Sequence, residues 1–139
     1  MIGEFHHSLD VKGRVNFPAK LREELGERFY ITKGLDGCLF VYSEAEWDKL
    51  AQRIRNQPIS KKRRELQRFF FGSAVEAEPD KQGRVNIPGP LRDFAGLDKE
   101  VVVVGSMDWA EIWDKARWKA QEAELEEETI AGNLDDFDF

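Results

Sequence analysis

The sequence contains few of the residues that build disulfides, metal sites or membrane spans. It has one cysteine, Cys38, and two histidines, His6 and His7, among 139 residues. A single cysteine cannot form an internal disulfide, and adjacent histidines on a strand point to opposite faces, so they are poorly placed to bind one metal ion. The longest apolar run, 101–104, is far shorter than the roughly 20 residues that span a bilayer. We therefore expect no disulfide, no metal and no membrane segment.

Signals for export and for catalysis are lacking as well. The first four residues do not form a basic start followed by an apolar stretch, so we expect no secretion signal. None of the serines lies in a nucleophile motif, and there is no glycine-rich phosphate loop. The sequence thus predicts a cytoplasmic protein that is not an enzyme, uses no cofactor and acts on no small-molecule substrate.

The charge is unevenly distributed along the chain. The net charge is −6, but residues 1–72 hold 14 basic and 10 acidic side chains, whereas residues 73–139 hold 7 and 17. Residues 120–139 alone carry 8 acidic side chains and no basic one, which leaves the remainder at +2. The sequence therefore predicts a mildly basic body followed by an acidic tail.

An internal repeat determines the expected architecture. Residues 10–26 (DVKGRVNFPAKLREELG) and 80–96 (DKQGRVNIPGPLRDFAG) are identical at nine of 17 positions, where chance would give roughly one. The similarity continues with one inserted residue, and it predicts repeats at 4–48 and 75–119, a helical connector at 49–74 and the tail at 120–139. A unit of about 45 residues buries too little surface to stand alone. We expect the two repeats to share one core around a pseudo-two-fold axis.

Each repeat shows the pattern of short strands and helices. In the first repeat, an Asp-x-x-Gly turn is followed by alternating Val15 and Phe17, and then by Pro18, which suits the start of a short helix. Strands are predicted at about 29–33, 38–42, 100–104 and 109–113. Ser43, Ser60 and Asp114 stand where they can cap helices. The fold class is a mainly β protein with short helices (α+β).

The repeated turn carries the candidate functional residues. Because Val15 and Phe17 face the core, Arg14 and Asn16 must point outward. Arginine presents donors suited to phosphate or guanine, and asparagine can pair with adenine. The aspartate of the turn would hold the guanidinium in place; alternatively, the pair is only a surface turn clamp. The predicted DNA-binding residues are Asp10, Lys12, Arg14, Asn16 and Arg22 in the first repeat, and Asp80, Lys81, Arg84, Asn86 and Arg92 in the second.

The segments FHHSLDVKGRVNFPAKLREELG, FFFGSAVEAEPDKQGRVNIPGPLRDFAGL and EIWDKARW resemble the MraZ family, which has two tandem SpoVT-AbrB-like units. The resemblance covers about residues 3–120. It implies a swapped-hairpin β-barrel made by both repeats and a ring-like homo-oligomer. It further implies a nucleoid-associated transcription regulator that binds repeated promoter sites on double-stranded DNA, including its own promoter and the division and cell-wall gene cluster. DNA contact then falls on Asp10, Arg14, Asp80 and Arg84.

Three alternatives stay open at this level. The chain could be a protein-interaction scaffold or an antitoxin-like partner protein with the same fold. The basic run 61–64 could be a solvated helix face or a nucleic-acid surface. The acidic tail could be a solubilising extension, or it could fold back on the basic motif surface of its own or a neighbouring subunit and compete with DNA.

Overall fold

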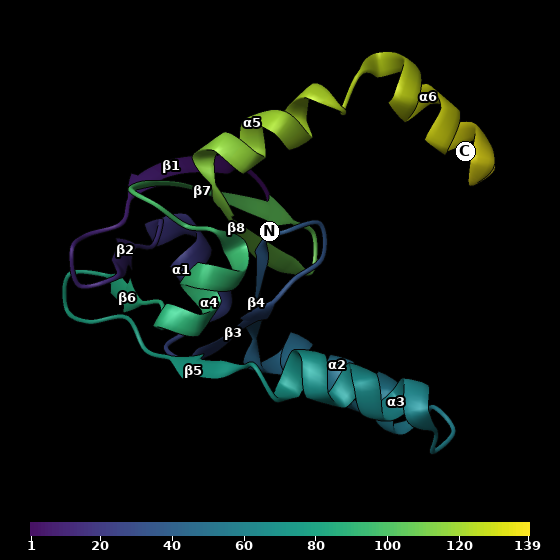
Figure 1. Ribbon diagram of the computed structural model, residues 1–139, viewed down its shortest axis with the longest axis horizontal. Coiled ribbons are helices and arrows are strands. Elements are labelled where there is room, and N and C mark those ends of the chain that lie inside the picture. Colours follow the sequence, from purple (N-terminus) through teal and green to yellow (C-terminus); the bar gives the residue numbers. More distant parts are fainter.

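The computed structural model describes residues 1–139, and the same order of elements occurs twice along the chain (Figure 1). The first set comprises β1 (Glu4–Ser8), β2 (Arg14–Asn16), α1 (Ala19–Leu25), β3 (Phe29–Lys33), β4 (Leu39–Ser43) and α2 (Glu44–Arg55). The second comprises β5 (Val75–Ala77), β6 (Arg84–Asn86), α4 (Gly89–Ala95), β7 (Glu100–Ser106), β8 (Trp109–Asp114) and α5 (Lys115–Ala123). Between them lie α3 (Lys61–Leu66) and a π-helical turn, η1 (Gln67–Phe71), and α6 (Glu127–Asp136) ends the chain.

The two sets exchange strands. Six strands form one antiparallel sheet in the order β1-β7-β8-β4-β3-β5, so the first strand of each set pairs with the third strand of the other. The order reads the same from both edges when the two sets are interchanged, which places a pseudo-two-fold axis between β4 and β8. The predicted mainly β fold, built by both repeats, is confirmed.

The expected closed barrel is not formed. β1 and β5 are the two edges of the six-stranded sheet, and β2 pairs only with β6 in a separate two-stranded sheet. A single bridge between Leu9 and Val15 connects β2 to the chain that follows β1. β2 and β6 are only three residues long because each soon reaches a proline, Pro18 or Pro88, that begins a helix. Strands this short cannot join the two edges.

One core lies between the sheets and the short helices α1 and α4. Val15, Val85 and Ile87 are almost fully buried there together with Leu21 of α1 and Leu91 of α4. Since both repeats supply these side chains, neither repeat has a complete core of its own. The shared core predicted from the sequence is therefore present.

A second apolar cluster covers the other side of the sheet and consists mainly of aromatic rings. Trp47 of α2 lies 4.3 Å from the ring of Phe71, and Trp118 of α5 lies 5.6 Å from Trp113. Cys38 is buried in the same cluster, and burial raises the pKa of its thiol, as expected for a small packed side chain. This cluster attaches the helices that close each repeat to the sheet.

The predicted helix caps are confirmed. The hydroxyl of Ser43 accepts the amide of Glu46, that of Ser60 accepts the amide of Arg63, and the carboxylate of Asp114 accepts the amide of Ala116. The connector is helical as expected, but its second part is a π-helical turn whose phenylalanines point into the aromatic cluster.

The C-terminal helix stands apart from the body. Figure 1 shows α5 leaving the sheet beside β1 and β7, and α6 continuing away from it. Every residue from 122 to 139 is exposed, so the tail does not fold back on the motif surface of its own chain. No helix is both long and apolar enough to cross a membrane.

Candidate nucleic-acid interface

The turn before β2 fixes an arginine through one aspartate. The Asp10 carboxylate accepts the backbone amides of Lys12 and Arg14 on one oxygen, each at 2.9 Å. Its other oxygen accepts Nε of Arg14 at 2.8 Å. Gly13, at φ +80°, closes this turn in a conformation that other residues rarely adopt. The arginine is therefore held by its Nε alone, and its two terminal nitrogens have no partner in the chain.

The same geometry recurs before β6. Asp80 accepts the amides of Gln82 and Arg84 at 2.9 Å, and Nε of Arg84 at 2.8 Å. In each turn, the hydrogen bond from the arginine amide is the main cause that lowers the pKa of the aspartate, with the guanidinium adding to it. Both carboxylates therefore stay charged well below neutral pH, and both turns keep their shape there.

Pairing of β2 with β6 brings the two turns together into one surface. Arg14 lies directly opposite Asn86, and Asn16 directly opposite Arg84. Val15 and Val85 pair between them and point the other way, into the core. Because side chains alternate along a strand, the two arginines and two asparagines share the outer face. We call these four residues the Arg–Asn patch.

The patch is a joint product of the two repeats. The Asn16 amide fits its surroundings best with its nitrogen toward the carbonyl oxygens of Gln82 and Gly83, at 3.1 and 3.3 Å. In the backbone, the amide of Phe17 donates to the carbonyl of Gly83, and that of Ile87 donates to the carbonyl of Gly13. Each turn is thus tied to the strand of the other repeat, a relationship that the sequence pattern did not reveal.

Arg22 and Arg92 lie beside the turns, each against the repeat opposite to its own. Nε of Arg22 donates to the carbonyl of Phe17 at 3.0 Å, and its guanidinium lies against Gly83 of the other repeat. Nη1 of Arg92 donates to the carbonyl of Ile87 at 2.7 Å and packs in the same way against Gly13. Both side chains are half-buried. Each arginine supports the turn of the opposite repeat. In the sequence, this role is indicated only by the glycines at equivalent positions of the two turns, Gly13 and Gly83.

The two turn lysines are exposed but are not equivalent. Lys12 is the second residue after Asp10, whereas the matching position after Asp80 is Gln82. Lys81 instead matches Val11, the most exposed of the large apolar residues. The tips of the two turns therefore differ, although the Arg–Asn patch beneath them is symmetric.

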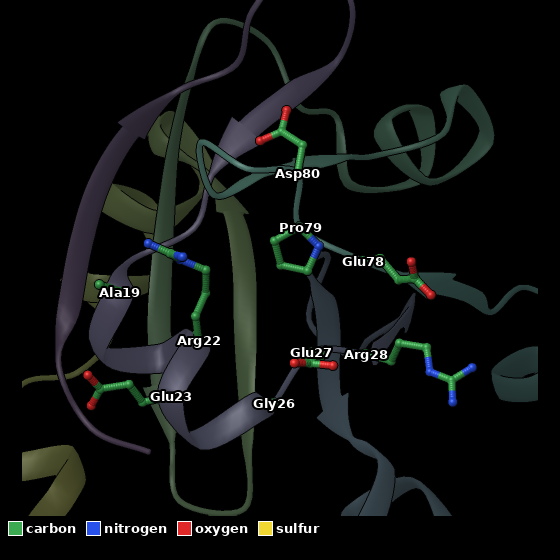
Figure 2. Close-up of a pocket in the computed structure, with 9 residues that line it drawn as sticks. All are labelled: Ala19, Arg22, Glu23, Gly26, Glu27, Arg28, Glu78, Pro79 and Asp80. Carbon is green, nitrogen blue, oxygen red and sulfur yellow. The ribbon is translucent and has the colours of Figure 1, made fainter.

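A hollow of about 840 Å³ lies between α1 and the segment that leads into β6. Figure 2 shows Arg22 on α1 and Asp80 at the start of the turn bordering this hollow, with Glu27 and Arg28 farther along it. It is wide and open, and six of its nine lining residues are charged. Small-molecule sites are typically enclosed and largely apolar, so this hollow lacks those features.

Two interlocked repeats with a duplicated Asp-x-x-Gly-Arg-Val-Asn turn define a tandem-repeat protein whose candidate site belongs to both halves. The family model described as "MraZ protein, putative antitoxin-like" matches residues 1–69 and again residues 70–138. The chain belongs to the MraZ family.

Curated relatives agree with this assignment over nearly their whole length. A protein of Moorella thermoacetica is 49% identical over 141 residues, and one of Ligilactobacillus salivarius is 49% identical over 141; both alignments cover 99% of each chain. A protein of Lachnoclostridium phytofermentans is 47% identical over 136 residues, covering 98% of this chain and 96% of the relative. All three are named Transcriptional regulator MraZ. The chain is thus assigned to the transcription regulators, a class that needs no catalytic centre.

One solved structure, the solution structure of PHS018 from Pyrococcus horikoshii, aligns over 80% of this chain and 86% of that one. It is 17% identical, with a TM-score of 0.32.

Proposed function

We propose that the chain binds double-stranded DNA sequence-specifically, as a homo-oligomer that engages repeated promoter sites. The observation that carries this is the pairing of Arg14 with Asn86 and of Asn16 with Arg84 on one outer face. In line with the family resemblance, the targets are its own promoter and the division and cell-wall gene cluster. Such a protein works in the cytoplasm, on the nucleoid.

The Arg–Asn patch has the chemistry and the size for reading a groove. A two-stranded β-ribbon fits the major groove of B-DNA, where arginine pairs with guanine O6 and N7 and asparagine pairs with adenine N6 and N7. Asp10 and Asp80 fix each arginine by its Nε, which leaves the terminal nitrogens free to bind and reduces the conformational entropy lost on binding. Lys12 and Lys81 at the exposed tips are suited to phosphate contacts.

Oligomerisation supplies the affinity that one copy lacks. The body carries a net charge of only +2, so the sequence-independent attraction of one copy to phosphate is weak. Several linked copies on repeated sites convert later binding events into intramolecular ones, which raises the overall affinity by orders of magnitude.

The test is fluorescence anisotropy with the duplex upstream of the chain's own gene and a scrambled duplex, over a series of salt concentrations. Arg14→Ala and Arg84→Ala are each expected to weaken specific binding about 5- to 150-fold, because a bidentate base contact contributes about 1–3 kcal/mol. The two effects should be similar, since the two turns have the same hydrogen-bond geometry. Lys119→Ala, which removes an exposed and unpaired positive charge on α5, is the matched control.

A second function, that of an interaction scaffold or antitoxin-like partner, is favoured by the wording of the family description. Under that function Arg14 is only a turn clamp, and the wild type and the arginine variants bind both duplexes equally weakly. Specific binding that falls steeply with salt and is lost in the arginine variants would exclude it.

A further inference from the structure

The C-terminal helix presents an acidic, partly apolar surface that nothing in the chain covers. None of the 8 acidic side chains between residues 120 and 139 takes part in an ion pair. Ile130, Leu134 and Phe137 follow at intervals of four and three residues, which places them on one side of the helix, and they are 40%, 43% and 77% exposed. This side chain arrangement is that of an amphipathic helix with no partner.

A helix of this length is poorly stable by itself. α6 has 10 residues, no side-chain cap at its start and no buried residue. Isolated helices shorter than about 12–15 residues are marginal in water, and most helices in proteins are stabilised by packing of one face. We therefore expect the apolar side of α6 to pack against a surface of another molecule.

The hairpin of α2 and α3 has the complementary character. Residues 53–68 contain seven basic side chains and a single acidic one, Glu65. Six of the seven are exposed and unpaired: Arg53, Arg55, Lys61, Lys62, Arg64 and Arg68. The seventh, Arg63, fixes the loop by donating to the carbonyls of Arg55 and Gln57.

An apolar floor accompanies this basic surface. A hollow of about 250 Å³ lies between α2 and the α3–η1 segment, and Ala51, Ile54 and Phe71 form its apolar part. Arg55, Arg63 and Gln67 complete its lining. The hollow thus offers apolar contacts inside a basic rim, which matches a helix with an apolar side and acidic flanks.

The two surfaces lie on opposite sides of the body. In Figure 1, α2 and α3 extend from the side of β3 and β5, whereas α6 extends beyond α5 from the side of β1 and β7. We infer that α6 of one copy docks in the α2–α3 hairpin of the next copy. Because the two contacting surfaces differ, the contact is head-to-tail and leads to a ring when the rotation closes. The inference rests on the homo-oligomeric part of the proposed function and gives it a specific contact.

Paired charge reversals test this contact. One variant carries Asp135→Lys with Asp136→Lys, and the other carries Lys61→Glu with Lys62→Glu. These positions keep lysines near the end of α6 and glutamates near the start of α3, where the helix dipole favours them. Light scattering coupled to size exclusion then gives the mass of each protein and of their equimolar mixture, without DNA. Asp98→Lys with Asp108→Lys, and Lys99→Glu with Lys119→Glu, are controls of equal charge at exposed sites without ion pairs.

Each reversed variant alone is expected to lose the wild-type oligomer mass, and the mixture is expected to regain it, because the reversed α6 of one protein fits the reversed hairpin of the other. Both controls should keep the wild-type mass. Wild-type mass in both reversed variants, or loss of mass without recovery on mixing, would overturn the inference. A wild type that is monomeric at every concentration would overturn the homo-oligomeric part of the proposed function as well. Fluorescence anisotropy with a duplex that contains one copy of the repeated site then reports separately whether the Arg–Asn patch binds DNA.

Discussion

Replacing Gly13 with alanine probes the support that Arg92 gives to the turn of the other repeat. Gly13 has a φ of +80°, and a Cβ there would overlap Nη1 of Arg92 and lie 2.8 Å from its Cζ. The carbonyl oxygen of Ile87 would be 3.3 Å away. The substitution therefore imposes an unfavourable backbone conformation and also displaces the guanidinium from Ile87.

The expected loss of stability is the sum of two contributions. A non-glycine residue in the left-handed region costs about 1–2 kcal/mol. Losing the part-buried hydrogen bond from Arg92 to Ile87 costs about 1–1.5 kcal/mol. Gly13→Ala should thus destabilise the fold by about 2–3.5 kcal/mol, and Arg92→Ala by at least the second amount. In the double variant the hydrogen bond is lost only once. The free energy of unfolding that the double variant loses should therefore be about 1–1.5 kcal/mol smaller than the sum of the two single losses.

Urea unfolding of the wild type, the two single variants and the double variant measures this coupling, at a protein concentration that keeps the oligomeric state constant. Thermal unfolding provides a second readout, where 1 kcal/mol corresponds to roughly 3–4 °C for a domain of this size. Losses that add within about 0.5 kcal/mol would refute the reasoning, because they would mean that Arg92 does not lie on Gly13. Arg14→Ala serves as the contrast: it should weaken DNA binding with little loss of stability.

Two further predictions concern one buried and one half-buried polar side chain. Thr32, the only buried polar side chain, donates its hydroxyl to the carbonyl of Phe70 in η1. Thr32→Val leaves that carbonyl unpaired, so it should lower the free energy of unfolding by about 1–3 kcal/mol in urea titrations. Thr32→Ser keeps the hydroxyl and should retain most of the wild-type stability. Burial, and then the charge of His6, lower the pKa of His7, so the unfolded chain takes up this proton more readily than the folded one. Stability should therefore fall as the pH drops below about 6.5 and level off below the lowered pKa. In His7→Gln this part of the melting-temperature profile between pH 7 and 5 should be flat; an unchanged slope would contradict the assignment to His7.

The elements themselves could be predicted from the sequence because their signals are local. The strand at 29–33 and the caps at Ser43, Ser60 and Asp114 agree with the structure, since alternation and capping involve residues close together in the chain. The outward direction of Arg14 and Asn16 followed in the same way from burial of Val15. Duplication of the motif added the pseudo-symmetry.

Contacts between the repeats could not be predicted in the same way. The local sequence around Arg14 does not indicate that Asn86 is its cross-strand neighbour, because strand register depends on the whole fold. The packing of Arg22 and Arg92 against the glycines of the opposite turns is likewise a contact between residues far apart in the sequence. The open edges at β1 and β5 could not be predicted from the sequence either, since closure of a sheet depends on the lengths of all its strands.

Strand exchange also sets the order in which a newly made chain can complete its fold. Glu4 of β1 pairs with Val104 of β7, so β1 emerges from the ribosome and waits for about one hundred more residues before its partner exists. Pairing across such distances makes folding slow, and an unpaired strand edge is prone to aggregate in the meantime. A chain interrupted before β7 is therefore not a finished first domain with a missing second one. Folding of the first residues is completed only when synthesis is nearly over.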